Sequence, residues 1–496
     1  MWTTLTLMVT ALAPQDARVA DAIRAAHAEQ QLTAAVDAVQ ARLAAVERVA
    51  IRSVDAPEYV TQLRGSGVGV LDLVRADLTF AGPDSWAPDA MLELVARLAD
   101  KSVPKVKSKP IDPREFERLC EHLHRDVVKA IGSGRDIETT SARLHAVLDK
   151  VRVVGMHEPW DKATRDLVAE RFERVGRAER DKLVVLARRL LAASMRWSDA
   201  KLLRQLVKKE AGPPRSIEGV RGDVLYDRET TFGRMVVGGP GPNEYECSQV
   251  DVIVDLGGDD IYRGPAGGAG EMRQLAVTID LAGNDRYEAI NDGLGSATFG
   301  IGLCLDFEGD DVYRGGDRCL GFGAAGVGMM IDLAGKDDYE IGTLGGGAAL
   351  AGLGICMDVD GSDKFVAAAE AFGCALPGGV GFYFDAAGDD ERTLGGHPNE
   401  IFGESITTSF GFGAGLGIHG QLPGGVGVCV DLAGNDRWIA RGLACGVGLD
   451  GGCGIIRDGG GDDVYEVGRG SLGVAIGPAV GVASDAAGDD KFSVLG

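Results

Sequence analysis

Pairs of aspartates recur at a fixed spacing through the C-terminal part of the sequence. Each pair belongs to the pattern Asp-x-x-Gly-x-Asp-x-aromatic, as in Asp-Leu-Ala-Gly-Asn-Asp-Arg-Tyr at 280–287. The first aspartates of the nine copies are Asp255, Asp280, Asp306, Asp332, Asp358, Asp385, Asp431, Asp458 and Asp485. The second aspartates are Asp260, Asp285, Asp311, Asp337, Asp363, Asp390, Asp436, Asp463 and Asp490. Successive copies are 25, 26, 26, 26, 27, 46, 27 and 27 residues apart, so this part of the chain is a repeat array.

Stacking the copies as coils would place equivalent carboxylates about 4.8 Å apart. Two adjacent negative charges at that distance repel by roughly 3–4 kcal/mol at an effective dielectric of 20, so something must offset the repulsion. The side chains can cap turn N–H groups, which we expect mainly of the first aspartates. They can pair with nearby basic residues, namely Arg286, Arg314, Lys364, Arg437 and Lys491. Alternatively Ca²⁺ can lie between coils at surface turns, since it prefers carboxylate and backbone oxygens.

The elements that would position these carboxylates can be read from one repeat. Ile301, Leu303 and Leu305 alternate with Gly302 and Cys304, which indicates a strand whose two faces are both crowded. A turn follows, with Gly309 at a place where we expect φ above zero. A second short strand passes through 312–313. A lap of 26 residues suits one coil of a parallel β-solenoid (β-helix) with two or three strands, and about nine to ten such coils fit residues 216–496.

An aromatic side chain closes nearly every copy of the pattern. The column consists of Tyr262, Tyr287, Tyr313, Tyr339, Phe365, Trp438, Tyr465 and Phe492, with Arg392 as the exception. We interpret it as core packing, the alternative being a stripe that stacks on sugars. Cys304, Cys356 and Cys429 share another position of the repeat and are interpreted as small buried hydrophobes rather than disulfide or zinc ligands.

The stretch Ala-Gly-Asn-Asp-Arg-Tyr at 282–287 resembles the Gly-Gly-x-Gly-x-Asp-x-U-x nonapeptide of RTX (haemolysin-type) calcium-binding β-rolls. Gly283, Asp285 and Tyr287 fall on its second glycine, aspartate and hydrophobic positions. The resemblance implies secretion, Ca²⁺-dependent folding and the second aspartate of each copy as ligand. This sequence departs from the family in having Asp280 and Leu281 where two glycines stand, and in its longer period. The repeats, within 250–496, are also similar to uncharacterised secreted bacterial proteins with Asp-Leu-Gly-Gly-Asp-Asp-x-Tyr arrays.

The N-terminal half has a different composition. Residues 1–13 fit a short signal peptide, 14–100 a helical segment, 101–113 an exposed Lys/Pro linker and 114–212 an all-α domain with a first helix near 113–131. Strands within 221–238 would form a first, atypical coil. Residues 1–220 carry 35 Lys+Arg and 31 Asp+Glu, a net charge of +4, whereas residues 221–496 carry 16 and 43, a net charge of −27.

A half with a net charge of −27 repels phosphate backbones and anionic lipid, so nucleic acid is excluded as a partner and divalent cations are favoured. A protein or glycan at the cell surface is a further partner to consider. The sequence has no apolar run of 18 residues, so we expect no transmembrane segment.

The gap of 46 residues between Asp385 and Asp431 indicates an insertion at about 393–412. His397, Glu400 and Glu404 lie in it and are weak candidates for acid–base catalysis or metal binding; a plain loop is the alternative.

The sequence favours a non-catalytic, exported structural or binding protein with an acidic, Ca²⁺-binding β-solenoid. The alternative is a polysaccharide-active enzyme on a β-helix scaffold, but the charged positions repeat evenly instead of gathering at one groove. We expect an extracytoplasmic location, with the cytoplasm as the alternative because the cysteines are unpaired.

Overall fold

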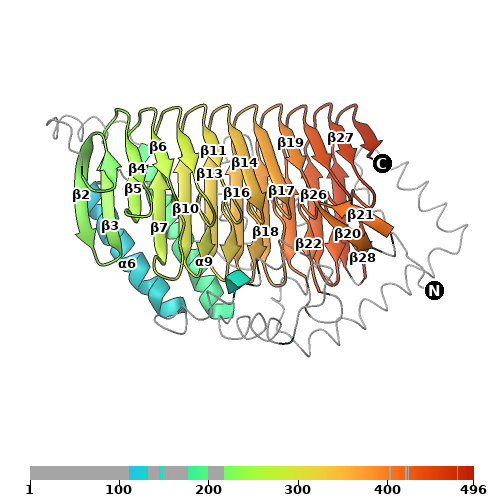
Figure 1. Ribbon diagram of the computed structural model, residues 1–496, viewed down its shortest axis with the longest axis horizontal. Helices are drawn as coiled ribbons and strands as arrows, with labels where there is room; N and C mark the ends of the chain where they lie inside the picture. The colour runs from blue at the N-terminus through green and yellow to red at the C-terminus, as the bar shows by residue number, and fades with distance from the viewer. Residues whose placement is uncertain are drawn as a thin grey trace, which may run out of the picture.

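The computed structural model describes residues 111–131, 144–146, 148, 162, 177–198, 217–401, 404–418, 422, 424–477 and 479–495. Two eleven-stranded sheets extend along the C-terminal part of the chain and enclose a shared interior (Figure 1). The chain alternates between the two sheets, and most of each sheet is parallel. This is the predicted parallel β-solenoid, with about nine turns from residue 252 onward.

Sheet 1 contains the strands that lead into the first aspartate of each copy. Its strands, in spatial order, are β2 (Val224–Thr230), β3 (Gly233–Gly238), β5 (Val252–Val254), β7 (Leu275–Ile279), β10 (Ile301–Asp306), β13 (Val327–Asp332), β16 (Leu353–Asp358), β18 (Val380–Asp385), β23 (Val426–Val430), β26 (Cys453–Asp458) and β29 (Val480–Asp485). Neighbouring strands pair in register with the sequence repeat, so that Ile301 lies opposite Val327 and Asp306 opposite Asp332.

Sheet 2 contains the strands that follow the second aspartate. They are β1 (Val220–Arg221), β4 (Glu244–Glu246), β6 (Ile261–Arg263), β8 (Arg286–Glu288), β11 (Val312–Arg314), β14 (Asp338–Thr343), β17 (Lys364–Ala369), β19 (Glu391–Leu394), β24 (Arg437–Ala440), β27 (Val464–Val467) and β30 (Lys491–Val494). Two sets of very short strands mark the return path, namely β9 (Ala297–Thr298), β12 (Gly323–Ala324) and β15 (Ala349–Leu350), and β22 (Gly415–Leu416), β25 (Gly448–Leu449) and β28 (Ala475–Ile476).

The N-terminal end of the solenoid is closed by antiparallel strands. β2 and β3 form a hairpin at the end of sheet 1, and β1 pairs antiparallel with β4 at the end of sheet 2. The predicted strands within 221–238 are therefore present as an atypical first coil. An antiparallel end presents a different edge from the parallel coils, which suits it to terminate the stack.

Two helices pack on the outer face of sheet 1 (Figure 1): α6 (Pro113–Ile131) and α9 (Arg177–Ser194), the latter followed by the 3₁₀ turn η2 (Met195–Ser198). Asp112 Oδ1 accepts the Glu115 N–H at 2.9 Å and caps α6, which begins with Pro113. The apolar stripe predicted from Phe116 to Ile131 is buried. The ring of Phe116 contacts Trp197 edge to face at 5.7 Å.

These helices share one apolar core with sheet 1, so within the described residues they do not form a separate core. The end of the predicted linker is also corrected, because Ile111 and Pro113 are buried at the start of α6. The predicted signal peptide at 1–13 and helical segment at 14–100 lie outside the described residues, as does most of the predicted all-α domain.

The interior between the sheets is filled by a stack of rings and a column of small side chains. From Tyr245 through Tyr262, Tyr287, Tyr313, Tyr339 and Phe365, neighbouring ring centroids are 4.4–5.1 Å apart and nearly parallel. These rings are buried, so the core interpretation is confirmed and the sugar-stacking stripe is wrong. All nine cysteines are buried free thiols, as predicted for the repeat position of Cys304.

Candidate metal centres

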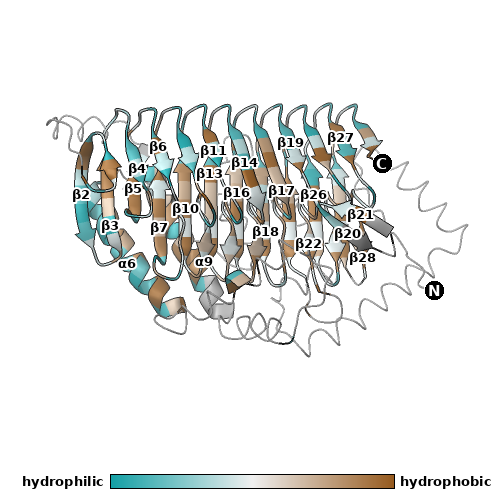
Figure 2. Ribbon diagram, in the orientation of Figure 1, coloured by the Kyte–Doolittle hydropathy of each residue, from teal (hydrophilic) through white to brown (hydrophobic). Residues whose placement is uncertain are grey.

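The first aspartate of each copy lies where a sheet 1 strand ends, on the face that points into the solenoid. Its backbone is followed by a turn, and its carboxylate caps that turn as predicted. Asp255 Oδ1 accepts the Gly257 N–H at 2.8 Å, and Asp280 Oδ1 accepts the Ala282 N–H at 2.9 Å. Hydrophilic residues consequently follow one long edge of the solenoid, where the chain passes from sheet 1 to sheet 2 (Figure 2).

The other oxygen of the first aspartate accepts a hydrogen bond from a tyrosine of the preceding coil. The Tyr287 hydroxyl donates to Asp306 Oδ2 at 2.6 Å, and the Tyr339 hydroxyl donates to Asp358 Oδ2 at 2.7 Å. The same bond joins Tyr262 to Asp280 and Tyr313 to Asp332. The aromatic column therefore supplies buried donors to the acidic column as well as apolar surface, a role that the sequence pattern did not predict.

The second aspartates form a ladder of their own. Asp311 Oδ1 accepts the backbone N–H of Asp285 at 2.6 Å, and Asp337 Oδ1 accepts that of Asp311 at 2.6 Å. The bond repeats from coil to coil as far as Asp490. The remaining oxygen, Oδ2, has no hydrogen-bond partner in six of these residues: Asp260, Asp285, Asp337, Asp363, Asp436 and Asp463.

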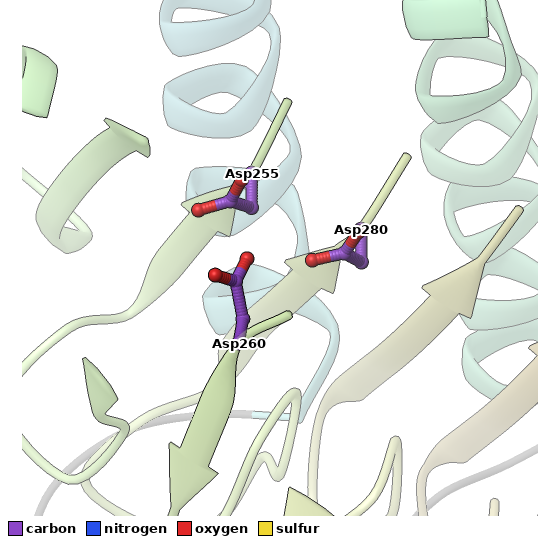
Figure 3. Close-up of side chains that lie close together, drawn as sticks. All are labelled: Asp255, Asp260 and Asp280. Carbon is purple, nitrogen blue, oxygen red and sulfur yellow. The ribbon is translucent and has the colours of Figure 1, made fainter. Parts of the chain in front are cut away.

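First and second aspartates together make triads of facing carboxylates (Figure 3). Each triad joins both aspartates of one copy to the first aspartate of the next copy, with one oxygen of each within 4.8 Å of the others. The triads include Asp255/Asp260/Asp280, Asp280/Asp285/Asp306, Asp306/Asp311/Asp332 and Asp332/Asp337/Asp358. Figure 3 shows the Asp260 carboxylate directed between those of Asp255 and Asp280.

These carboxylates are buried, which corrects the expectation that they lie at surface turns. Sixteen of the eighteen motif aspartates are buried; Asp485 and Asp490, in the last coil, are partly exposed. Burial and the neighbouring Asp280 carboxylate raise the pKa of Asp285 to about 10. Burial likewise raises the pKa of Asp260 to about 7. A group of buried carboxyls in this state is stabilised either by protons or by a bound cation.

The basic residues expected to neutralise the columns pair elsewhere. Arg286 contacts Glu288, Arg314 contacts Asp338 and Glu340, and Arg437 contacts Glu391 and Glu466. They lie on the strands of sheet 2 that follow each motif, one residue before or after the inward-pointing aromatic. The alternation of a strand therefore turns their side chains outward.

One basic residue does enter the columns, and it is the exception in the aromatic series. Arg392 is fully buried, and its Nη2 lies 2.8 Å from Asp385 Oδ2, 2.7 Å from Asp390 Oδ2 and 2.6 Å from Asp431 Oδ2. Its Nη1 lies 3.3 Å from Asp436 Oδ1. The sequence signal for this contact was a cation at a core position flanked by two carboxylate columns.

Glycines keep the turns close-packed. A Cβ on Gly309 would lie 1.7 Å from the carbonyl oxygen of Gly283 in the coil before. Gly309 does not have a positive φ, so the earlier explanation of this glycine is wrong. It is required because successive turns stack with no room for a side chain.

The predicted insertion is present as a hairpin of β20 (His397–Ile401) and β21 (Glu404–Thr408). β18 still pairs directly with β23 across it, so the solenoid continues without interruption. His397 Nε2 lies 3.1 Å from Oε2 of the fully buried Glu370, a residue that sequence reasoning missed. The backbones of Glu400 and Glu404 lie in the hairpin, but their side chains, like residue His419, lie outside the described part of the structure.

Searches against protein-family models, curated proteins and solved structures found no match to this chain. In the described part of the chain, neither α6 nor α9 nor any other helix has the length and apolar character that a membrane crossing requires. The β-solenoid with its buried aspartate clusters, which have the composition and spacing to hold a metal ion, is therefore the basis for considering function.

Proposed function

We propose that the solenoid is a non-catalytic binding or structural protein that holds Ca²⁺ in its buried aspartate triads. The observation that carries the proposal is the second-position Oδ2 atom, which is buried, has no hydrogen-bond partner and belongs to a triad of carboxylates. Asp285 Oδ2 in the triad Asp280/Asp285/Asp306 is an example. An unpaired buried carboxylate oxygen is costly, and a cation bound there would remove the cost.

The donor set favours a hard cation. All the donors are oxygens, and two ligands of one Ca²⁺ ion, each about 2.3–2.6 Å from it, are at most about 5 Å apart. The spacing within the triads meets that limit. The four triads from Asp255 to Asp358 draw on nine carboxylates because neighbouring triads share a first aspartate. Four divalent ions would leave those nine charges nearly neutralised.

In this proposal the ions act structurally. They would join each coil to the next at the level of the turns and relieve the mutual repulsion of the columns. The alternative of a polysaccharide-active enzyme would need its acid and base elsewhere, because the motif aspartates that are buried cannot touch a glycan. Export fits the proposal because extracellular modules use Ca²⁺ at 10⁻⁴–10⁻³ M affinities. Mass spectrometry of the protein from its host would test export, since cleavage after Ala13 would leave Pro14 as the first residue.

The deciding experiment is thermal unfolding of the full chain in excess EGTA and in millimolar Ca²⁺, with Mg²⁺ as a control. A ligand that binds only the folded state stabilises it by about 2.7 kcal/mol per site at one hundred times Kd. We expect a large rise in Tm that Ca²⁺ produces and Mg²⁺ does not. An unchanged Tm would overturn the proposal and would leave protonated aspartates as the explanation of the columns.

Matched variants place the effect in the triads. Asp285→Asn keeps an oxygen to accept the Asp260 N–H but removes the buried charge, so it should raise the Tm in EGTA and shrink the rise that Ca²⁺ produces. Asp310→Asn is the control, because Asp310 is the exposed residue next to Asp311 and accepts an equivalent backbone N–H from Lys336. It should leave both values unchanged.

A further inference from the structure

Arg392 occupies a defined level of the repeat. It pairs in register with Phe365 on one side and Trp438 on the other, and so stands in the aromatic column. Its guanidinium lies 5.9 Å from the Phe365 ring centroid and 4.4 Å from that of Trp438, close enough for cation–π attraction. The side chain thus takes the place of a ring in the stack while carrying a positive charge into the interior.

The guanidinium lies inside a triad. Asp385, Asp390 and Asp431 are both aspartates of one copy and the first aspartate of the next, the same composition as the other triads. One nitrogen, Nη2, is within 2.8 Å of an oxygen of each. A single positively charged atom therefore sits among the three carboxylates, where a bound metal ion would otherwise lie.

Arg392 also performs the task of the tyrosines. In the coils before it, the phenol of one coil donates to the first aspartate of the next, as Tyr287 does to Asp306. Arg392 Nη2 donates to Asp431 Oδ2 at 2.6 Å, which is the equivalent bond. The rings beside it, Phe365 and Trp438, carry no hydroxyl.

The other triads have no such group. Among the described residues, no Lys, Arg or His forms an ion pair with the nine aspartates from Asp255 to Asp358 of those four triads. Asp285 Oδ2 there is buried and unpartnered, whereas the matching atom of Asp390 accepts a hydrogen bond from Arg392. The contrast between these two oxygens is independent of the acidity of the cluster and indicates a missing cation in one case and a built-in one in the other.

We propose that Arg392 is an internal counter-ion that replaces the metal ion at one level and so divides the array into two separate runs of cation sites. One run lies before Asp385, and the other lies after Asp431. This inference rests on the proposed function. It specifies which triads bind ions and which triad is closed to them.

The test counts bound Ca²⁺ per chain by equilibrium dialysis of the full-length protein after removal of metal with EGTA. Each second aspartate belongs to a single triad. Asp285→Asn should therefore lower the count by one ion, and Asp390→Asn should leave it unchanged. Equal losses from the two variants would overturn the assignment of Arg392.

A second variant tests the same point by gain. Arg392→Tyr restores the ring and the phenol and should raise the count by one ion, whereas Arg392→Lys, which keeps a positive charge, should not. Arg437→Gln is the control for loss of a charge, since Arg437 pairs only with the half-exposed Glu391 and Glu466 at the surface. It should bind as many ions as the native chain.

The outcomes separate the two proposals. If the native chain binds Ca²⁺ but Arg392→Tyr gains none, the inference about Arg392 fails and the proposed function stands. If the native chain binds none and Arg392→Tyr binds one, the proposed function fails and the role of Arg392 stands. If neither binds, both fail. Should Arg392→Tyr not fold, the comparison of Asp285→Asn with Asp390→Asn still decides the inference.

Discussion

Single glycines and tyrosines determine how closely the layers of this solenoid approach. Gly302 lies on the inner face of β10, and a Cβ there would be 2.2 Å from the carbonyl oxygen of Ser296 on the return path. Gly328 meets the carbonyl oxygen of Phe322 in the same way, at 2.1 Å. The repeated Gly-x-Gly before each motif is thus explained by contact between two backbone segments, and not by an unusual φ at these positions.

Gly302→Ala should destabilise the protein by about 1–3 kcal/mol, because the new methyl group must displace backbone rather than a flexible side chain. Gly241→Ala is a matched control, since a Cβ at Gly241 would meet nothing within 4 Å and Gly241 does not have a positive φ. It should change stability by less than about 0.5 kcal/mol. Urea unfolding measures both, and equal effects would contradict the packing argument.

Tyr287→Phe isolates the phenol from the ring. The stack is kept, but Asp306 Oδ2 loses the donor that lies 2.6 Å away in a fully buried position. Leaving a buried acceptor unsatisfied costs about 1–3 kcal/mol, so the urea midpoint should fall accordingly. An unchanged midpoint would mean that another donor reaches this carboxylate.

At the scale of elements, the solenoid accepts an inserted hairpin without losing register. β20 and β21 leave the coil after β19, while β19 pairs directly with β24 and β18 with β23. The hairpin is attached to the coil by His397, whose ring nitrogen contacts Glu370 at 3.1 Å. Burial raises the pKa of Glu370, and the hydrogen bond from His397 opposes that rise.

His397→Ala should therefore cost about 1–3 kcal/mol, because it removes the charged partner that the structure places on a buried carboxylate. Adding Glu370→Gln to that variant removes the buried charge and should restore most of the lost stability. Urea unfolding of the two single variants and the double variant measures the coupling. Strictly additive effects would show that the contact contributes no coupling energy.

At the scale of the whole molecule, the aspartate columns should make stability depend on pH in opposite ways with and without cations. Burial raises the folded-state pKa of Asp260 and Asp311 to about 7 and that of Asp285 and Asp337 to about 10. The unfolded value is about 3.9. Since the folded pKa is the higher one, the contribution of these carboxyls is fully present below about pH 4 and is lost as the pH rises through 7 to 10.

In chelator, the Tm should therefore fall as the pH is raised from about 6 to about 9. In millimolar Ca²⁺ the fall should be reduced or reversed, because metal ligands must be deprotonated and protons compete with the ion. Thermal unfolding across this range in both conditions measures the difference. Parallel curves would show that protons alone occupy the columns.

Repetition made much of this fold predictable. A period of 26 residues allows one assignment of strand, turn and strand to be checked in every copy, and in-register stacking follows because identical residues lie opposite one another. The parallel β-solenoid, its nine or so turns, the buried cysteine position, the capping first aspartates and the inserted segment all follow from local pattern. The helix beginning at Pro113 follows from its apolar stripe and its capping Asp112.

Other features depend on which face of a strand points inward and on contacts between coils, and these only the tertiary structure decided. Asp306 shares the inner face of its strand with Gly302 and Cys304, so the carboxylates are buried, although a charged residue at a turn is usually exposed. The phenol of Tyr287 reaches the next coil, and Glu370 meets His397 across the base of the hairpin. Arg392 is a single exception in the sequence, and it becomes a counter-ion because two columns of carboxylates meet around it in space.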